Sequence, residues 1–139
     1  MWPERIALLR GETHLRRLIL WGGGLTSDRL QGLGKVTQIE ALAIGECPVD
    51  DALFEEVVLL RALKFLNLSQ TNVCAGFARI AELPVAELVL EGCQRVTDEA
   101  LPGIAEIAAL SRLVLRGAST TPEGIAEFSR VRPRCEVIR

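Results

Sequence analysis

The sequence predicts an α/β solenoid, a right-handed coil with a curved parallel sheet on its inner side and short helices on its outer side. Three observations predict this fold. Aliphatic triplets recur at a regular interval along the 139-residue chain, each is followed by apolar residues at helical spacing, and aromatic residues make up only 4% of the sequence. Stacked repeats bury a continuous aliphatic core, and this composition supplies one.

Each aliphatic triplet has the pattern expected of a short strand with its apolar side chains turned inward. The triplets are Leu15, Leu18, Leu20; Ile39, Leu42, Ile44; Leu63, Leu66, Leu68; Val85, Leu88, Leu90; and Leu110, Leu113, Leu115, with Cys135 and Ile138 beginning a sixth. Their first residues are separated by 24, 24, 22, 25 and 25 residues. A period of about 20 to 29 residues is typical of repeats that pair one strand with one helical turn.

The period predicts a single domain over residues 1–139. Its expected units are a half repeat or N-terminal cap over 1–14, five repeats, and a terminal strand over 135–139. The repeats are 15–38, 39–62, 63–84, 85–109 and 110–134. Two interpretations of the first half repeat stay open. Trp2 and Pro3 help to cap this end, or the chain is one segment of a longer protein.

The second half of each repeat carries helix-start signals. Thr97 and Asp98 precede Leu101 and Ile104, and Thr121 and Pro122 open a similar run. Thr and Asp accept hydrogen bonds from the first amides of a helix, and proline is tolerated at the first helical position. We therefore expect a short helix after each strand.

At these residues the chain resembles the leucine-rich-repeat family, over residues 4–139. The run 93–101, Cys-Gln-Arg-Val-Thr-Asp-Glu-Ala-Leu, is similar to the cysteine-containing, ribonuclease-inhibitor-like subclass. The resemblance implies a protein-binding solenoid. Where most members carry Asn after the strand, this chain has Gly23, Cys47, Thr71, Cys93 and Ala118, so the loop backbone needs other hydrogen-bond partners.

The residues between the inward positions should face the concave side of the sheet. They form three columns across the strands, about 4.8 Å apart from member to member. The columns are Arg17, Ala41, Phe65, Glu87, Arg112; Ile19, Ala43, Asn67, Val89, Val114; and Trp21, Gly45, Ser69, Glu91, Arg116. We expect a depression over Ala41, Ala43 and Gly45, and ion pairs between the two Glu and the two Arg of the fourth and fifth strands.

The columns predict a partner-binding face. Large apolar side chains at outward positions are the anchors that protein interfaces use. Its candidate residues are Arg17, Ile19, Trp21, Phe65, Asn67, Glu87, Glu91, Arg112 and Arg116. Other interpretations stay open: Trp21 folds back onto Trp2, the charged half is merely a solvated face, or the apolar patch and uncapped ends serve self-association.

The predicted function is therefore non-enzymatic binding of another protein. The alternatives are a substrate-recruiting adaptor or inhibitor subunit, and a structural segment of a longer solenoid or homo-oligomer. A net charge of −2 disfavours nucleic acid, and the lack of a leader-like start or long apolar run favours a cytoplasmic protein without a membrane partner. Arg130, Arg132 and Arg134 are interpreted as a solvated basic end.

Nothing in the sequence predicts catalysis, a cofactor or a metal. The single histidine, His14, is expected in a surface loop without a neighbouring nucleophile. Cys47, Cys93 and Cys135 are predicted to be small buried residues, and Cys74 to be partly exposed. The Gly22–Gly24 run is interpreted as a turn leaving the first strand. A phosphate-binding loop is not predicted at Lys35, because Val36 stands where Ser or Thr is required and Arg29 stands where the first glycine is required.

Overall fold

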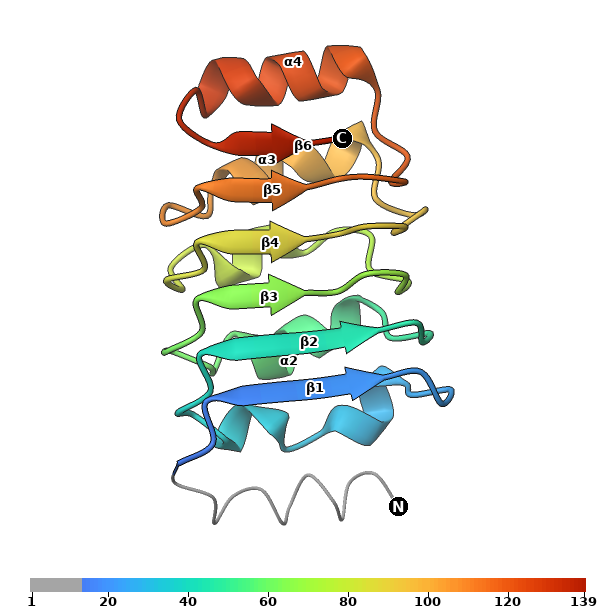
Figure 1. Cartoon of the computed structure of the whole chain (residues 1–139), viewed down its shortest axis with the longest axis vertical. Helices are drawn as coiled ribbons and strands as arrows, with labels where there is room; N and C mark the ends of the chain where they lie inside the picture. Colours follow the sequence, from blue (N-terminus) through green and yellow to red (C-terminus); the bar gives the residue numbers. More distant parts are fainter. Residues whose placement is uncertain (1–13) are drawn as a thin grey trace.

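The computed structural model describes residues 14–139, which form one six-stranded parallel sheet with the strands in chain order. The strands are β1 (Arg17–Trp21), β2 (Ala41–Gly45), β3 (Phe65–Asn67), β4 (Glu87–Val89), β5 (Arg112–Val114) and β6 (Glu136–Ile138). Figure 1 shows them stacked one above another with the helical segments behind the sheet. The predicted α/β solenoid is confirmed. The first half repeat, with Trp2 and Pro3, lies outside the described residues.

The outer side of the coil is built mainly from single helical turns. The short segments are η2 (Ser27–Leu30), η3 (Leu33–Lys35), η4 (Asp51–Leu53), α2 (Phe54–Val57), η5 (Phe77–Ile80), η6 (Asp98–Ala100) and α3 (Leu101–Ala105), and the one longer helix of the described residues is α4 (Pro122–Val131). In α4 the Thr121 side chain accepts from the Gly124 amide and Pro122 opens the helix, as its sequence predicts. Across residues 14–139, no helix is long and apolar enough to cross a bilayer.

The core lies between the sheet and the helical turns. The central members of the inner triplets, Leu42, Leu66, Leu88 and Leu113, are completely buried. Two aromatic rings pack in the core in the middle of the stack. Phe54 contacts Phe77 edge to face, with ring centroids 5.0 Å apart. In the first coil Leu20 is buried, whereas Leu15 and Leu18 are only half-buried.

Thr71 and Cys93 stand at two of the positions where an asparagine would follow the strand, and their side chains make hydrogen bonds to the backbone there. The Thr71 hydroxyl donates to the Leu68 carbonyl at 2.8 Å, and the buried Cys93 thiol donates to the same carbonyl at 3.0 Å. A single carbonyl thus receives donors from two successive coils. This arrangement satisfies a buried acceptor with small side chains that pack like the core around them.

Aspartates at the starts of the helical turns link one coil to the next. Asp51 accepts from the amide of Cys74 at 2.8 Å, and Asp98 accepts from the amide of Thr121 at 2.8 Å and from the Thr121 hydroxyl. These two hydrogen bonds from Thr121 lower the pKa of the Asp98 carboxyl, because they favour its charged form. The coils are therefore joined by polar contacts on the outer side as well as by the sheet.

Arg132 does not lie in a solvated basic end, contrary to the interpretation of its cluster. Its guanidinium donates four hydrogen bonds to backbone carbonyls of the preceding coil, those of Ala105, Ile107, Ala108 and Leu110, at 2.7, 2.8, 3.3 and 2.9 Å. Its planar fork of donors suits a ring of carbonyls at the end of a helix. Arg130 pairs with Glu127 within α4, and Arg134 is exposed.

Candidate functional site

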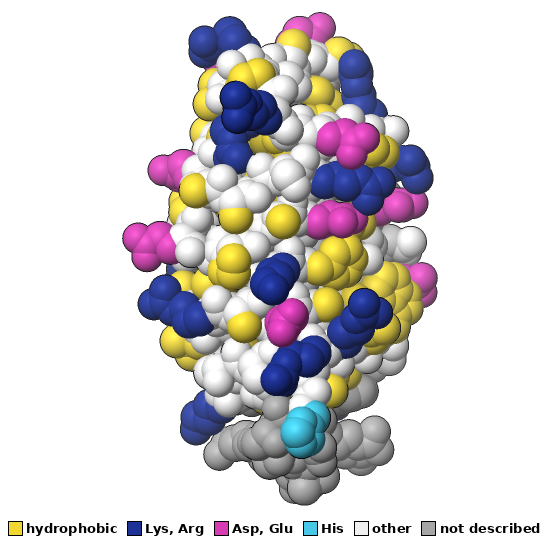
Figure 2. Space-filling view, turned by 60° about the vertical axis from the view of Figure 1, so that its left-hand side comes forward, with side chains coloured by type: hydrophobic (Ala, Val, Ile, Leu, Met, Phe, Trp, Pro, Cys, Tyr) yellow, Lys and Arg dark blue, Asp and Glu magenta, His cyan; other side chains and the backbone are white. Residues whose placement is uncertain are grey.

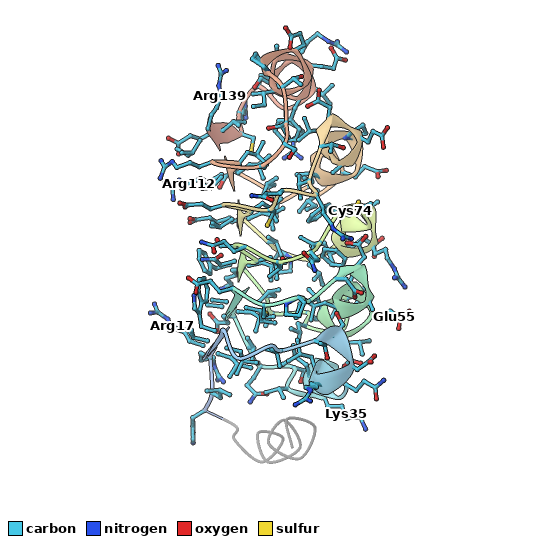
Figure 3. The ribbon with its side chains drawn as sticks, turned by 90° about the vertical axis from the view of Figure 1, so that its right-hand side faces the viewer. Arg17, Lys35, Glu55, Cys74, Arg112 and Arg139 are labelled. Atoms are coloured by element: carbon cyan, nitrogen blue, oxygen red, sulfur yellow. The ribbon has the colours of Figure 1, made fainter. Side chains whose placement is uncertain are left out.

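The sheet register sets the outward columns side by side. Arg17 pairs with Ala41, which pairs with Phe65, and the same row continues through Glu87 and Arg112. Ile19, Ala43 and Asn67 form the neighbouring row. Because these residues alternate with the buried triplets, their side chains leave the sheet on the side away from the helices. In Figure 3 Arg17 and Arg112 project from the sheet side, whereas Lys35, Glu55 and Cys74 lie toward the helical side.

A hollow of about 360 Å³ lies on this face over β1, β2 and β3. Its outward side chains are Arg17, Ile19, Ala41, Ala43 and Phe65, and its lining also includes Leu18 and Leu42. The two alanines of β2 form a low floor between larger neighbours. Ile19 is 70% exposed, more than any other large hydrophobic side chain within residues 14–139. In Figure 2, where the sheet face lies toward the right, hydrophobic side chains gather there beside basic ones.

The hollow is narrower than expected, because Trp21 covers Gly45. A methyl group added to Gly45 would lie only 2.6 and 2.7 Å from Cζ3 and Cζ2 of the Trp21 ring. The indole therefore lies against the glycine backbone and occupies the space that an open depression would need. Trp21 remains 44% exposed in this position. Trp2, onto which Trp21 was alternatively expected to fold back, lies outside the described residues.

Only one of the two expected ion pairs forms in the charged half of the face. Nη1 of Arg112 lies 2.7 Å from Oε2 of Glu87, and Nε of Arg112 lies 3.3 Å from Oε1 of Glu136. Glu91 and Arg116 are exposed and form no ion pair within residues 14–139. The expectation fails for them because β4 ends at Val89 and β5 at Val114, so both residues lie on loops.

Asn67 and Ser69 are less exposed to a binding partner than their places in the outward columns imply. The side-chain oxygen of Asn67 accepts from the amide of Ser69 at 3.0 Å and from its hydroxyl at 2.6 Å. Ser69 is itself buried, so the third column does not face outward at β3. Asn67 therefore turns its oxygen toward its own loop, which leaves its amide nitrogen as the group for a partner.

The sequence reasoning missed a group of charged residues where the strands begin. Glu40 lies between two basic side chains, 3.5 Å from Nε of Arg16 and 3.6 Å from Nζ of Lys64. These residues precede the first column by one position in each repeat, and that shared phase could have identified them. Glu136 was also missed, for a different reason. It continues the first column into the sixth strand, next to Arg112, and the sequence prediction ended that column at the fifth strand.

Arg17 is the arginine that lines the hollow on the sheet face. It is exposed, lines the hollow, and makes no ion pair or side-chain hydrogen bond with any described residue. By contrast, Arg112 is held by two glutamates. Within the described residues, the five donors of the Arg17 guanidinium therefore have no ion-pair or side-chain partner at the border of the hollow.

The cysteines and the histidine take the positions predicted for them. Cys47, Cys93 and Cys135 are buried, Cys74 is exposed, and all four are free thiols. Burial raises the pKa of the three buried thiols, most directly by removing water from the thiolate form. His14 is exposed, and within residues 14–139 no cluster of metal-ligating side chains occurs.

This arrangement predicts that the folded protein has one reactive thiol. We expect Ellman's reagent to modify a single equivalent rapidly under native conditions and four equivalents in denaturant, because only Cys74 is exposed. Cys74→Ser should abolish the rapid phase, and Cys93→Ser should leave it intact. Rapid modification of more than one thiol in the folded protein would contradict the burial of the other three.

No known protein-family model matches the chain. Solved structures of other proteins resemble it, including the following two. An internalin from Listeria monocytogenes has a TM-score of 0.66 at 20% identity, over 94% of this chain and 36% of the internalin chain. A leucine-rich-repeat protein from Leptospira interrogans has a TM-score of 0.63 at 17% identity, over 99% of this chain and 33% of that chain. The chain thus has the leucine-rich-repeat fold and spans about a third of these proteins; the cysteine-containing subclass is not confirmed.

Proposed function

We propose that this chain is a non-enzymatic protein-interaction module that binds a partner protein through its concave sheet face. The observation that carries the proposal is the exposure of Ile19, 70%, at the border of an apolar hollow. Trp21 and Phe65 extend the same apolar surface on both sides. Large exposed apolar side chains grouped around a hollow are typical of protein-binding sites.

The energy of binding comes mainly from these three side chains. Complete burial of a side chain such as isoleucine contributes about 1.5 to 3 kcal/mol, and truncation of an interface tryptophan costs about 2 kcal/mol or more. Trp21 is already fixed against Gly45, so little conformational freedom is lost when a partner covers its exposed edge. The ion pairs around Arg112 are exposed and contribute orientation more than affinity.

Replacement of Ile19 by Asp should weaken partner binding at least about tenfold while leaving the fold intact. The change places a charge in the middle of the apolar surface but removes no core side chain, because Ile19 lies outside the core. Proteins from an extract of the source organism are captured on immobilised wild type and on the variant, and are quantified by mass spectrometry. Trp21→Ala and Phe65→Ala should act in the same direction.

Leu59→Asp is the matched control. Leu59 is 49% exposed and lies outside the core, in the turn that follows α2 rather than on the sheet face. A partner that binds the concave face is retained by Leu59→Asp and lost from Ile19→Asp. Equal capture by both variants and the wild type would contradict the proposal, provided that all three unfold with the same midpoint.

The structural alternative is favoured by one observation, that the chain spans only part of the proteins it resembles. A segment that extends a longer solenoid, or pairs with a second copy, would use its end coils rather than its concave face. Light scattering over a range of concentrations distinguishes the two. A monomer whose mass does not change with concentration supports the module, and a concentration-dependent oligomer supports the structural role.

A further inference from the structure

We infer that the segment recognised by the concave face carries a carboxylate next to an apolar side chain, with the carboxylate on Arg17 and the apolar group in the hollow over β1 to β3. The inference rests on the proposed function and names the chemistry of its partner. It starts from Arg17, which forms no ion pair with any described residue and stands beside an otherwise apolar lining.

Arg17 and the apolar floor of the hollow are close enough together for one short peptide segment to contact both. Arg17, Ala41 and Phe65 share one row across three parallel strands. Neighbouring strands are about 4.8 Å apart, so Arg17 and Phe65 stand roughly 10 Å from each other with the floor between them. Side chains two residues apart in an extended segment are separated by about 6.6 Å and point to the same side. An acidic residue and an apolar residue in that spacing reach Arg17 and the floor together.

The charges around the hollow favour an acidic rather than a basic segment. Among the described residues that line the hollow, Arg17 is the one charged side chain, and none is acidic. Glu40 already lies between Arg16 and Lys64. The nearest acid on the other side, Glu87, is bonded to Arg112 at 2.7 Å. An incoming carboxylate therefore meets a guanidinium that has no ion pair with the described residues, whereas an incoming ammonium meets no acid among the described residues that line the hollow.

The size of the hollow points to side chains as its occupants. Its volume, about 360 Å³, is near the lower limit of pockets that take whole small molecules, about 300 to 1,000 Å³. Its floor, at Ala41 and Ala43, is apolar. One or two aliphatic or aromatic side chains fit in such a space and displace water from Phe65 and Ile19, while Arg17 at the border fixes the direction of the segment through a bidentate contact.

The inference is tested with a random peptide library displayed on phage and selected on the immobilised wild-type chain. We expect the enriched peptides to share an acidic residue two positions from an aliphatic or aromatic one. The most enriched peptide is then synthesised with a fluorophore, and its Kd is measured by anisotropy. Arg17→Gln should raise Kd about two- to fivefold, and Arg17→Glu by about tenfold or more, since like charges then meet.

Arg29→Glu is the charge-matched control. Arg29 is exposed on η2, behind the sheet, and forms no ion pair with the described residues, so its reversal should leave Kd unchanged. Ile19→Asp reports on the proposed function separately. Peptides that need Ile19 but show no acidic preference and no effect of Arg17→Glu would overturn this inference and leave the proposed function standing. Selection that yields no peptide dependent on Ile19 would contradict both. If the wild type self-associates and Ile19→Asp abolishes this, the inference is also overturned, because a second copy of the chain then occupies the hollow.

Discussion

Replacement of Phe54 by Ala is expected to lower the free energy of unfolding by about 3 to 5 kcal/mol, the usual cost of removing a buried aromatic ring. Phe54 is completely buried at the start of α2, and its ring meets that of Phe77 at an interplanar angle of 64°. It also borders Gly76, where an added methyl group would lie 3.2 Å from the Phe54 ring. Loss of the ring opens a cavity in the centre of the stack, where coils on both sides depend on it.

Urea denaturation followed by circular dichroism measures this effect, with the midpoint and the slope determined separately. Leu59→Ala is the control, because Leu59 is half exposed, and its change should stay within about 0.5 kcal/mol. Phe54→Leu, which keeps most of the apolar volume, should lose less than the alanine variant. A loss below about 1 kcal/mol for Phe54→Ala would mean that the ring does not pack in the core as described.

Arg132→Met should destabilise the last coil by about 2 to 3 kcal/mol, since a hydrogen bond to a charged group contributes about 1.5 to 3 kcal/mol and several carbonyls lose their donor together. The guanidinium holds four carbonyls of the preceding coil, the nearest at 2.7 Å. Methionine keeps the apolar stem of the side chain but none of its donors. Amide hydrogen exchange should therefore speed up most in α4 and β6.

Arg132→Lys separates charge from geometry. An ammonium group is a point charge and cannot reach a ring of carbonyls as a planar fork does, so an intermediate loss is expected. Arg134→Met, at an exposed position two residues away, should leave the midpoint unchanged. If Arg132→Met and Arg134→Met unfold together at the wild-type midpoint, the contacts of Arg132 contribute nothing to stability.

The strands and their buried leucines could be predicted from the sequence, because the direction of each of these side chains is set by its own strand. A strand alternates faces, and a period near 24 residues returns each triplet above the last, so the burial of Leu42, Leu66 and Leu88 needs no further information. The row containing Arg17, Ala41 and Phe65 follows from the same alternation. This reasoning extends to any side chain whose direction is set by its own strand.

The remaining features depend on contacts that the period does not encode. Trp21 covers Gly45 because its ring bends sideways onto the next strand, and Arg132 reaches back across a whole coil to its carbonyls. Glu91 and Arg116 were expected to pair because the strands were assumed to run further than they do. Packing between coils determines which side chains bend away from their own row and where each strand ends.

The division of each strand into inward and outward positions has a consequence for how this protein can diverge. None of Ile19, Ala43 and Phe65 belongs to the core, and Leu42 is the core leucine that also lines the hollow on the concave face. Substitutions in one set therefore leave the free energy of the other almost untouched. Related chains can acquire a new binding preference at a few outward positions while keeping the same interior, and a library that varies only those positions should yield folded proteins at high frequency.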